Sequence, residues 1–175
     1  MRRLKPATLL AAASLAISAC SNSRKPLAAL PEESATLASV LSVADPHTVA
    51  QLVHGFWNLE GNTWRWTMRS FGVVLRPPEA ALGHGARLEL RFTLPPQTIE
   101  KAGVMTVRAA VNGFHLDPQS FAAAGDHAYI RDVPAEALEA GAVTVEFSTD
   151  KVTQAGSGEI RELALVVTAV GLTAR

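Results

Sequence analysis

Apolar and polar residues alternate along most of the chain beyond position 45, with the two-residue period of a β-strand. The cleanest alternation runs from Ala86 to Leu94, where leucines and a phenylalanine are interleaved with Arg, Glu, Arg and Thr. This run predicts a half-buried antiparallel strand with opposite charges along its exposed face. The same reasoning predicts further strands at 49–53, 64–75, 105–111, 114–116, 127–133, 143–148 and 160–172.

Turn-forming residues separate these runs. Asn112 and Gly113 lie between two alternating segments, and this pair favours a tight hairpin because a type I′ turn needs positive φ at both central residues. Residues 60–62 predict another reversal, and single helical turns are expected at 98–102 and 134–138. Short strands, Gly/Pro turns and no long helix predict an all-β fold, an antiparallel β-sandwich of jelly-roll or galactose-binding-like topology, with one or two single-turn helices.

Residues 55–78 hold all three tryptophans of the chain. Trp64 and Trp66 alternate with polar residues, which favours a place in the core, whereas Trp57 lies beside a turn and is the better candidate for exposure. The apolar positions change parity after residue 70. Because a regular strand cannot change parity, we expect a bulge or kink at 69–70.

The first twenty residues have the pattern of a secretory signal. Three basic residues precede an apolar stretch at 9–17, which is too short to span a bilayer core of ~30 Å. The stretch ends in Ser-Ala-Cys at 18–20 and resembles the lipobox of bacterial lipoproteins. The resemblance implies that Cys20 is acylated and becomes the mature amino terminus. Ser21, in place of aspartate, favours the outer membrane. The alternative is an ordinary signal peptide with an incidental cysteine.

The expected organisation is a signal peptide at 1–19, a flexible tether at 20–44 and a monomeric β-sandwich domain at 45–175. The tether is rich in Ser, Ala, Pro and Leu without a sustained period. The whole chain carries 16 basic and 16 acidic residues, and it has no basic stripe. A nucleic-acid partner is therefore not expected. The expected partner is membrane lipid, through the acylated Cys20, together with an envelope glycan or an envelope protein.

No residue pattern typical of metal binding or catalysis stands out. The five histidines are scattered and no HExxH motif is present. The Gly-Ser-Gly at 156–158 does not have the spacing of a GxSxG nucleophile elbow. Neither a metal nor a cofactor is expected, and the chain is not expected to be an enzyme. A glycoside hydrolase-like enzyme is a distant alternative, because its carboxylate pair is defined by a separation in space.

The tryptophan-rich stretch supports a sharper hypothesis. Aromatic faces on sandwich folds can stack on sugar rings while neighbouring polar groups bind the hydroxyls. The candidate ligand-binding residues on this hypothesis are Trp57, Glu60, Asn62 and Arg65.

A second set of charged residues is a candidate structural ion network. Its members are Asp132, Arg161 and Glu162. They are expected either to form surface pairs of little energetic value or to form a partly buried network with Arg65 and Glu60.

Several short motifs between positions 52 and 172 resemble a bacterial β-sandwich module that occurs in cell-envelope lipoproteins and beside sugar-transfer domains. The most specific is Trp-Arg-Trp-Thr at 64–67; the others are Gly55-Phe56, Glu60-Gly61, Leu75-Arg76-Pro77-Pro78, Val111-Asn112-Gly113, Arg131-Asp132-Val133-Pro134 and Arg161-Glu162-Leu163. The resemblance implies a glycan or envelope setting. It favours a glycan-binding or glycan-associated module first, and a structural or protein-interaction lipoprotein second. The module has an aspartate and a small residue before Arg-Glu-Leu, where this chain has Glu159 and Ile160.

Overall fold

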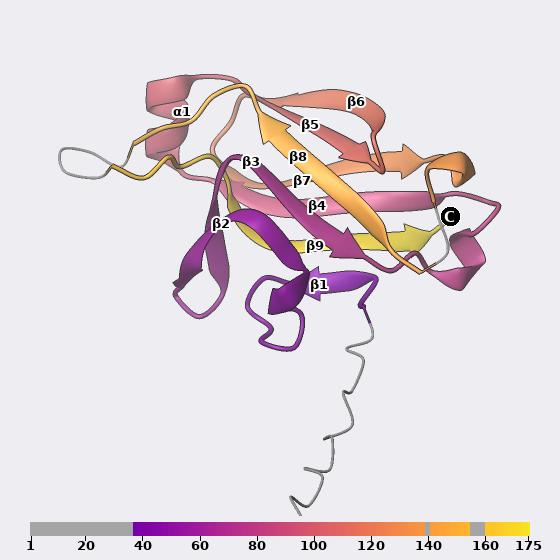
Figure 1. Ribbon diagram of the computed structural model, residues 1–175. Coiled ribbons are helices and arrows are strands. Elements are labelled where there is room, and N and C mark those ends of the chain that lie inside the picture. Colours follow the sequence, from indigo (N-terminus) through magenta and orange to yellow (C-terminus); the bar gives the residue numbers. More distant parts are fainter. Residues whose placement is uncertain (1–36, 139–140, 155–159) are drawn as a thin grey trace, which may run out of the picture. The chain divides into compact units, whose positions relative to one another are not determined.

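The computed structural model describes residues 37–138, 141–154 and 160–175 (Figure 1). The predicted signal peptide, the lipidation site Cys20 and most of the predicted tether lie outside these residues. The strands of the described chain are β1 (Val40–Ser42), β2 (Leu52–Glu60), β3 (Trp64–Leu75), β4 (Ala86–Leu94), β5 (Met105–Val111), β6 (Phe114–Phe121), β7 (Gly125–Val133), β8 (Val143–Thr149) and β9 (Val166–Ala174). Its helical elements are α1 (Pro96–Ala102) and the 3₁₀ turns η1 (Val49–Gln51), η2 (Glu79–Ala81) and η3 (Ala135–Ala137).

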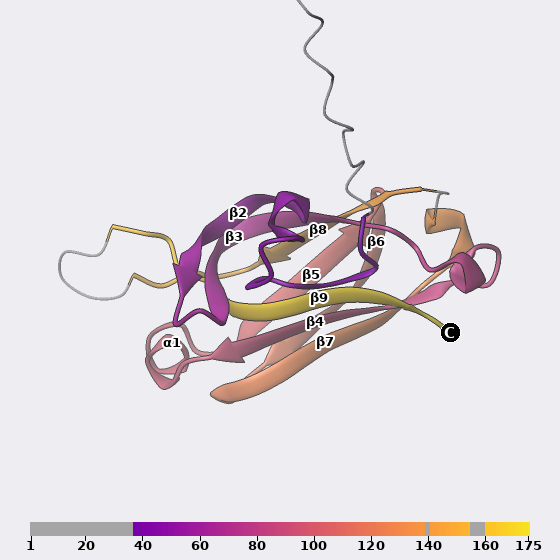
Figure 2. The same ribbon diagram turned by 90° about the horizontal axis from the view of Figure 1, so that it is seen from below.

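The strands form two facing layers, and every pairing between them is antiparallel (Figures 1 and 2). One layer has the order β6-β5-β8-β3-β2, and the other has the order β1-β9-β4-β7. Strand β3 belongs to both layers, because Arg65 and Trp66 pair with β9 while residues 70–75 pair with β8. Most paired strands are distant in sequence, as they are in jelly-roll sandwiches. The predicted antiparallel β-sandwich is confirmed.

The alternating runs place their apolar side chains between the layers. In β4, Leu88, Leu90 and Leu94 are fully buried and Phe92 is 2% exposed. The predicted hairpin is also present, because Val111 pairs with Phe114 and both turn residues between them have positive φ. The predicted helical turns correspond to α1, which has seven residues, and to η3. No helix in the described part of the chain is long and apolar enough to cross a membrane.

The sandwich begins earlier than the predicted boundary at residue 45. Strand β1 pairs with β9, and Leu41 is only 1% exposed. The strand predicted at 49–53 is wrong in its first half, where η1 stands instead. The helical turn carries the buried Gln51 into the space between the layers, where its amide donates to the carbonyls of Ala38 and Val74. A buried amide needs such partners, and this requirement overrides the local strand pattern.

The last strand is shorter than predicted, since β9 begins at Val166 and not at residue 160. Ile160 is 90% exposed, and Leu163 makes only an isolated bridge to Thr153. The buried residues at 164–165 bond to the main chain and hydroxyl of Thr67 instead of continuing a ladder. An apolar run therefore marks burial here without marking a regular strand.

An irregularity of the β2–β3 ladder lies between Thr67 and Gly72, at the position of the predicted bulge, but the change of parity that led to the prediction is absent. His54 pairs with Gly72 and Phe56 pairs with Thr67, so five steps along β3 match two along β2. The expectation that Trp64 and Trp66 lie in the core is wrong, because both are only partly buried, whereas Thr67, which follows Trp66, is fully buried. Thr67 has the same parity as the buried side chains of the second half of β3, so the core side of the strand is the odd-numbered one on both sides of the bulge.

Candidate functional site

The β2–β3 hairpin carries all four predicted ligand-binding residues. Its turn is closed by a hydrogen bond from the Thr63 N–H to the Glu60 carbonyl, and both Gly61 and Asn62 have positive φ. The indole of Trp64 lies against Gly61 so closely that a Cβ at this position would clash with the ring. The turn is therefore rigid, and Asn62 is exposed at its tip.

Trp57 lies on β2 of the hairpin and contacts the segment before β9. Its indole N–H donates to the carbonyl of Glu162 at 2.9 Å, and the Arg161 guanidinium lies 5.7 Å from its ring centroid. Arg161 also donates to a Glu60 carboxylate oxygen at 2.9 Å, and about one third of each side chain is exposed. We call Trp57, Glu60 and Arg161 the hairpin cluster.

Arg65 donates hydrogen bonds that fix the main chain next to the hairpin cluster. Its Nε donates to the carbonyl of Val43 at 2.9 Å, and one terminal nitrogen donates to the carbonyl of Trp57 at 3.1 Å. Charge-assisted hydrogen bonds of this kind are stronger than neutral ones. The guanidinium that was a candidate ligand group thus connects β2 to the segment that follows β1.

The three residues of the predicted ion network lie in two places. Arg161 joins the hairpin cluster, and the Glu162 carboxylate accepts a hydrogen bond from the Arg69 main-chain N–H. Asp132 does not share their site: the β4–β7 register places it beside Arg87, at 3.8 Å, and it lies 3.3 Å from Arg175. Arg175 follows the end of β9, whereas Trp66 pairs with its first residue. The predicted grouping of Asp132 with Arg161 and Glu162 is therefore wrong.

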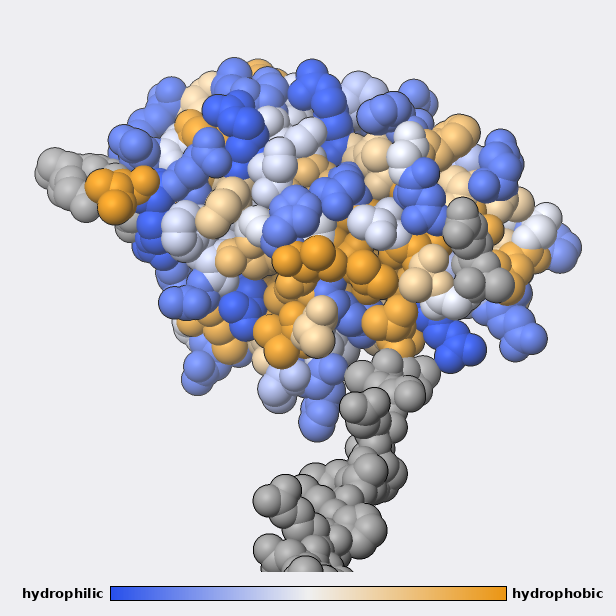
Figure 3. Space-filling view, in the orientation of Figure 1, coloured by the Kyte–Doolittle hydropathy of each residue, from blue (hydrophilic) through white to orange (hydrophobic). Residues whose placement is uncertain are grey.

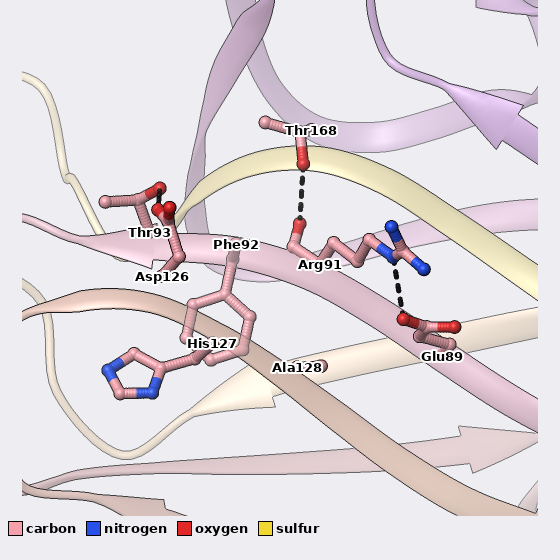
Figure 4. A pocket seen from close by; sticks show the side chains of 8 residues that line it. All are labelled: Glu89, Arg91, Phe92, Thr93, Asp126, His127, Ala128 and Thr168. Carbon is pink, nitrogen blue, oxygen red and sulfur yellow. Dashed lines mark hydrogen bonds and ion pairs between the residues drawn. The ribbon is translucent and has the colours of Figure 1, made fainter.

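A second candidate site lies on the outer face of the β9-β4-β7 layer, and the sequence analysis did not identify it (Figure 4). It is a depression of about 490 Å³ lined by Glu89, Arg91, Phe92, Thr93, Asp126, His127, Ala128 and Thr168. The Arg91 Nε donates to Glu89 at 2.7 Å, and the Thr93 hydroxyl donates to Asp126. Side chains of three strands therefore surround this hollow.

The depression adjoins a second hollow of about 300 Å³, which shares Glu89 and Arg91 but otherwise lies over β9 and β1, where it is lined by Val40, Ala169, Val170, Gly171 and Thr173. We call the two together the β4 groove. Small residues keep it open, because Arg91 is flanked across the sheet by Ala128 on β7 and Ala169 on β9. Gly171 has the same effect beside β1, where a Cβ would lie 2.9 Å from a Val40 methyl group.

A β-bulge in β9 shapes the hollow that Thr168 lines. Arg91 pairs with Ala169 and Phe92 pairs with Val167, so Thr168 is an extra residue in β9. Its hydroxyl donates to the Arg91 carbonyl at 3.4 Å (Figure 4). Bulges often redirect a side chain beside a functional site, and this one brings a hydroxyl into the groove.

The edge strands β6 and β7 form a further hollow of about 660 Å³. Here the Tyr129 hydroxyl donates to the Asp117 carbonyl at 2.9 Å, and Arg131 lies over the Tyr129 ring while donating to carbonyls of β6. Burial raises the pKa of Tyr129 to about 12. These contacts bridge two edges that share no strand ladder, so we assign them to the closure of the sandwich.

The rest of the described surface offers less specific chemistry. His54 and Glu146 form an exposed pair at 2.8 Å. Apolar side chains gather near the middle of the face in Figure 3, and Val49 and Val53 are among the exposed apolar residues. Among the described residues, no group of three or more His, Cys, Asp or Glu side chains is arranged to hold a metal ion.

No protein-family model and no curated protein sequence matches this chain. Several solved structures are similar, among them the following three. A family 35 carbohydrate-binding module from an environmental isolate has a TM-score of 0.42 and 14% identity, over 82% of this chain and 90% of the module. A CBM36 carbohydrate-binding module in complex with calcium and xylotriose has a TM-score of 0.36 and 8% identity, over 59% and 72%. An exo-β-1,3-galactanase from Phanerochaete chrysosporium has a TM-score of 0.44 and 12% identity, over 77% of this chain and 29% of the enzyme. These similarities are remote, and neither a ligand nor a site is transferred from them.

Proposed function

We propose that this chain is a non-catalytic, glycan-binding β-sandwich that is anchored in the cell envelope, in the outer membrane, through acyl chains on Cys20. The observation that carries the glycan part is the fixed orientation of Trp57. Its N–H is bound to Glu162, so the ring is held at one angle while part of it stays exposed. A ring that is ordered before binding loses little conformational entropy when a sugar stacks on it.

Polar groups that suit hydroxyl recognition lie beside this ring. The Glu60 carboxylate and the Arg161 guanidinium are each about one third exposed, and Asn62 is exposed at the neighbouring turn. They supply acceptors and donors at the edge of the aromatic surface. Arg65 positions Trp57 by donating a hydrogen bond to its carbonyl, and it has no direct part in binding the sugar.

The anchor rests on the leader sequence. A basic start, a short apolar stretch and Ser-Ala-Cys at 18–20 are the features of a lipoprotein signal. Acyl chains contribute ~0.8 kcal/mol per buried CH₂, so more than one chain makes a stable anchor. Mass spectrometry of the mature amino terminus tests this part. Cleavage elsewhere, or an unmodified Cys20, contradicts it.

A glycan array with the wild-type domain, Trp57→Ala and Trp57→Phe tests the binding part. Loss of the ring in Trp57→Ala is expected to weaken binding at least about tenfold, which corresponds to ~1.4 kcal/mol. Trp57→Phe keeps one aromatic ring but loses the N–H that fixes its orientation, so its affinity is expected to lie between those of the wild type and Trp57→Ala. Thermal melts establish that both variants are folded. Equal binding by all three proteins, or no binding by the wild type, overturns the proposal. Release of reducing ends from a bound glycan would indicate a hydrolase instead.

The same cluster also favours a second candidate, a structural or protein-interaction lipoprotein. The Trp57 N–H and two donor atoms of Arg65 are already bound to main-chain carbonyls, as they are in a purely structural clamp. On this alternative, Trp57→Ala lowers the melting temperature while the wild type binds no glycan.

A further inference from the structure

We propose that the β4 groove is a second glycan-binding site, which binds a linear, neutral oligosaccharide across the outer face of β4 and β9. The inference rests on the proposed function in its ligand class, but it concerns a different surface. The groove lies on the outside of the β1-β9-β4-β7 layer, which Figure 2 presents from below, whereas the hairpin cluster lies on β2 and the segment before β9.

The shape of the groove favours a linear ligand. Its two hollows share Glu89 and Arg91, and they follow one another obliquely across the sheet, from β7 and β4 near Thr93 to β9 and β1 near Thr173. Thr173 on β9 pairs with Arg87 on β4. The groove therefore covers the length of β4 from Arg87 to Thr93, which is six residues, or roughly 20 Å at ~3.3 Å per residue. A compact molecule would fill one hollow only, whereas an extended chain contacts both.

The side chains of the groove suit a ligand rich in hydroxyl groups. Carboxylate acceptors on Glu89 and Asp126 lie on either side of the donor Arg91, and the hydroxyls of Thr93 and Thr168, whose protons are donated within the protein, add further acceptors. The Arg91 side chain is 65% exposed, so most of its guanidinium faces solvent even though its Nε is bound to Glu89.

The charge of the groove favours a neutral ligand over a charged one. Two carboxylates would repel a polyanion, and each already accepts a hydrogen bond within the protein, from Arg91 or from Thr93, which weakens the attraction for a polycation. The pairing of Arg91 with Glu89 also holds both head groups in place before binding. Because these residues lie on strands and not on loops, the groups are presented with fixed spacing.

Titration of the ¹⁵N-labelled domain with linear hexasaccharides of glucose, xylose and N-acetylglucosamine, followed by NMR, locates the site. At least one of them is expected to shift the amides of residues 89–93, 126–128 and 168–171. A hexamer of galacturonic acid serves as the charged probe and is expected to bind more weakly. Binding of the charged probe alone overturns the assignment of a neutral ligand.

Two variants test the groove directly. Arg91→Ala removes the central donor, and Ala128→Gln fills the hollow with a neutral side chain; each is expected to raise the Kd for the bound hexasaccharide at least about tenfold. The matched control is Arg108→Ala, because Arg108 is an exposed strand arginine on β5 in the other layer. Its Kd is expected to equal that of the wild type. Melting curves of all variants exclude loss of the fold as the cause.

The outcomes separate this inference from the proposed function. If the wild type binds no oligosaccharide, both fail. If it binds, and if Trp57→Ala loses binding while the two groove variants do not, the proposed function stands and the groove inference is overturned. If the groove variants lose binding and Trp57→Ala does not, the protein binds glycan at the groove, and the assignment of the hairpin cluster as a sugar-binding site is wrong.

Discussion

The hairpin cluster and the β4 groove differ in how far their polar groups are already bound within the protein. At the hairpin, the Trp57 N–H and two nitrogens of Arg65 donate to main-chain carbonyls. In the groove, Glu89 and Arg91 bind each other on an open face, and 65% of the Arg91 side chain is exposed. Residues typical of a ligand site can therefore serve the fold first. The comparison predicts that changes at the hairpin alter stability more than changes in the groove do.

The largest difference is expected between two arginines. Arg65→Ala removes two charge-assisted hydrogen bonds and leaves the carbonyls of Val43 and Trp57 without these donors. We expect the free energy of unfolding to fall by ~2–4 kcal/mol, since a hydrogen bond to a charged group contributes ~1.5–3 kcal/mol and the site is partly exposed. Urea unfolding monitored by tryptophan fluorescence measures the change.

The matched variant in the groove is Arg91→Ala. Its side chain is mostly exposed and its ion pair with Glu89 is open to solvent, so we expect a change within ~0.5 kcal/mol. Equal losses of stability in the two variants would remove the distinction between the two regions.

A pH series extends the comparison to a third polar group that is bound inside the sandwich. Burial raises the pKa of Tyr129 to about 12, from an ordinary value near 10, so the folded chain holds the phenol proton more tightly than the unfolded chain does. The resulting stability is complete below about pH 10 and is lost as the pH rises towards 12. Two pKa units correspond to roughly 2–3 kcal/mol.

Urea unfolding at pH 9 and at pH 11.5 measures this loss. Lysine side chains ordinarily titrate in the same range, so Tyr129→Phe provides the reference, and the difference between the two proteins isolates the phenol. Tyr129→Phe should lose less stability than the wild type over this interval. The same loss in both proteins would mean that the Tyr129 proton is not held more tightly in the folded chain.

The sequence predicts the groove strand far better than it predicts the hairpin. The buried positions of β4 follow from local alternation, and the Asn112-Gly113 turn follows from its need for positive φ. Neither depends on distant parts of the chain. In the first half of β3 the buried residue is Thr67, because segment 163–165 docks there by hydrogen bonds to it. No local pattern encodes that docking.

The candidate sites show the same division. Trp57, Glu60 and Arg161 could be proposed from residue type and from neighbouring turns, although their mutual contacts could not. The β4 groove depends on Ala128 and Ala169 lying on either side of Arg91. These three residues lie on three strands that are far apart in sequence, so the hollow exists only once the sheet register is known. The single local sign was the charged outer face of β4.

A smaller effect is expected when position 57 keeps one aromatic ring but loses the pyrrole part of the indole with its N–H. Trp57→Phe leaves the Glu162 carbonyl without this donor, and we expect a loss of ~1–2 kcal/mol because an unsatisfied, partly buried acceptor is costly. Guanidinium chloride unfolding followed by circular dichroism measures it. A fully stable Trp57→Phe would indicate that water replaces the indole N–H, and the hairpin would then resemble the groove in its exposure.

The smallest expected change in stability is that of Glu89→Gln. The substitution keeps the shape of the side chain but removes the charge that pairs with Arg91, and only 31% of the Glu89 side chain is exposed. Exposed and partly exposed ion pairs contribute ~0–1 kcal/mol, so the free energy of unfolding is expected to change by less than ~0.5 kcal/mol. Hexasaccharide binding is expected to weaken in the same variant, because a neutral amide no longer holds the Arg91 head group in place and accepts weaker hydrogen bonds from sugar hydroxyls. Calorimetric titration and urea unfolding of one protein preparation measure both quantities. A large loss of stability without loss of binding would show that Glu89 serves the fold, as Arg65 does, and would reverse the contrast between the two regions.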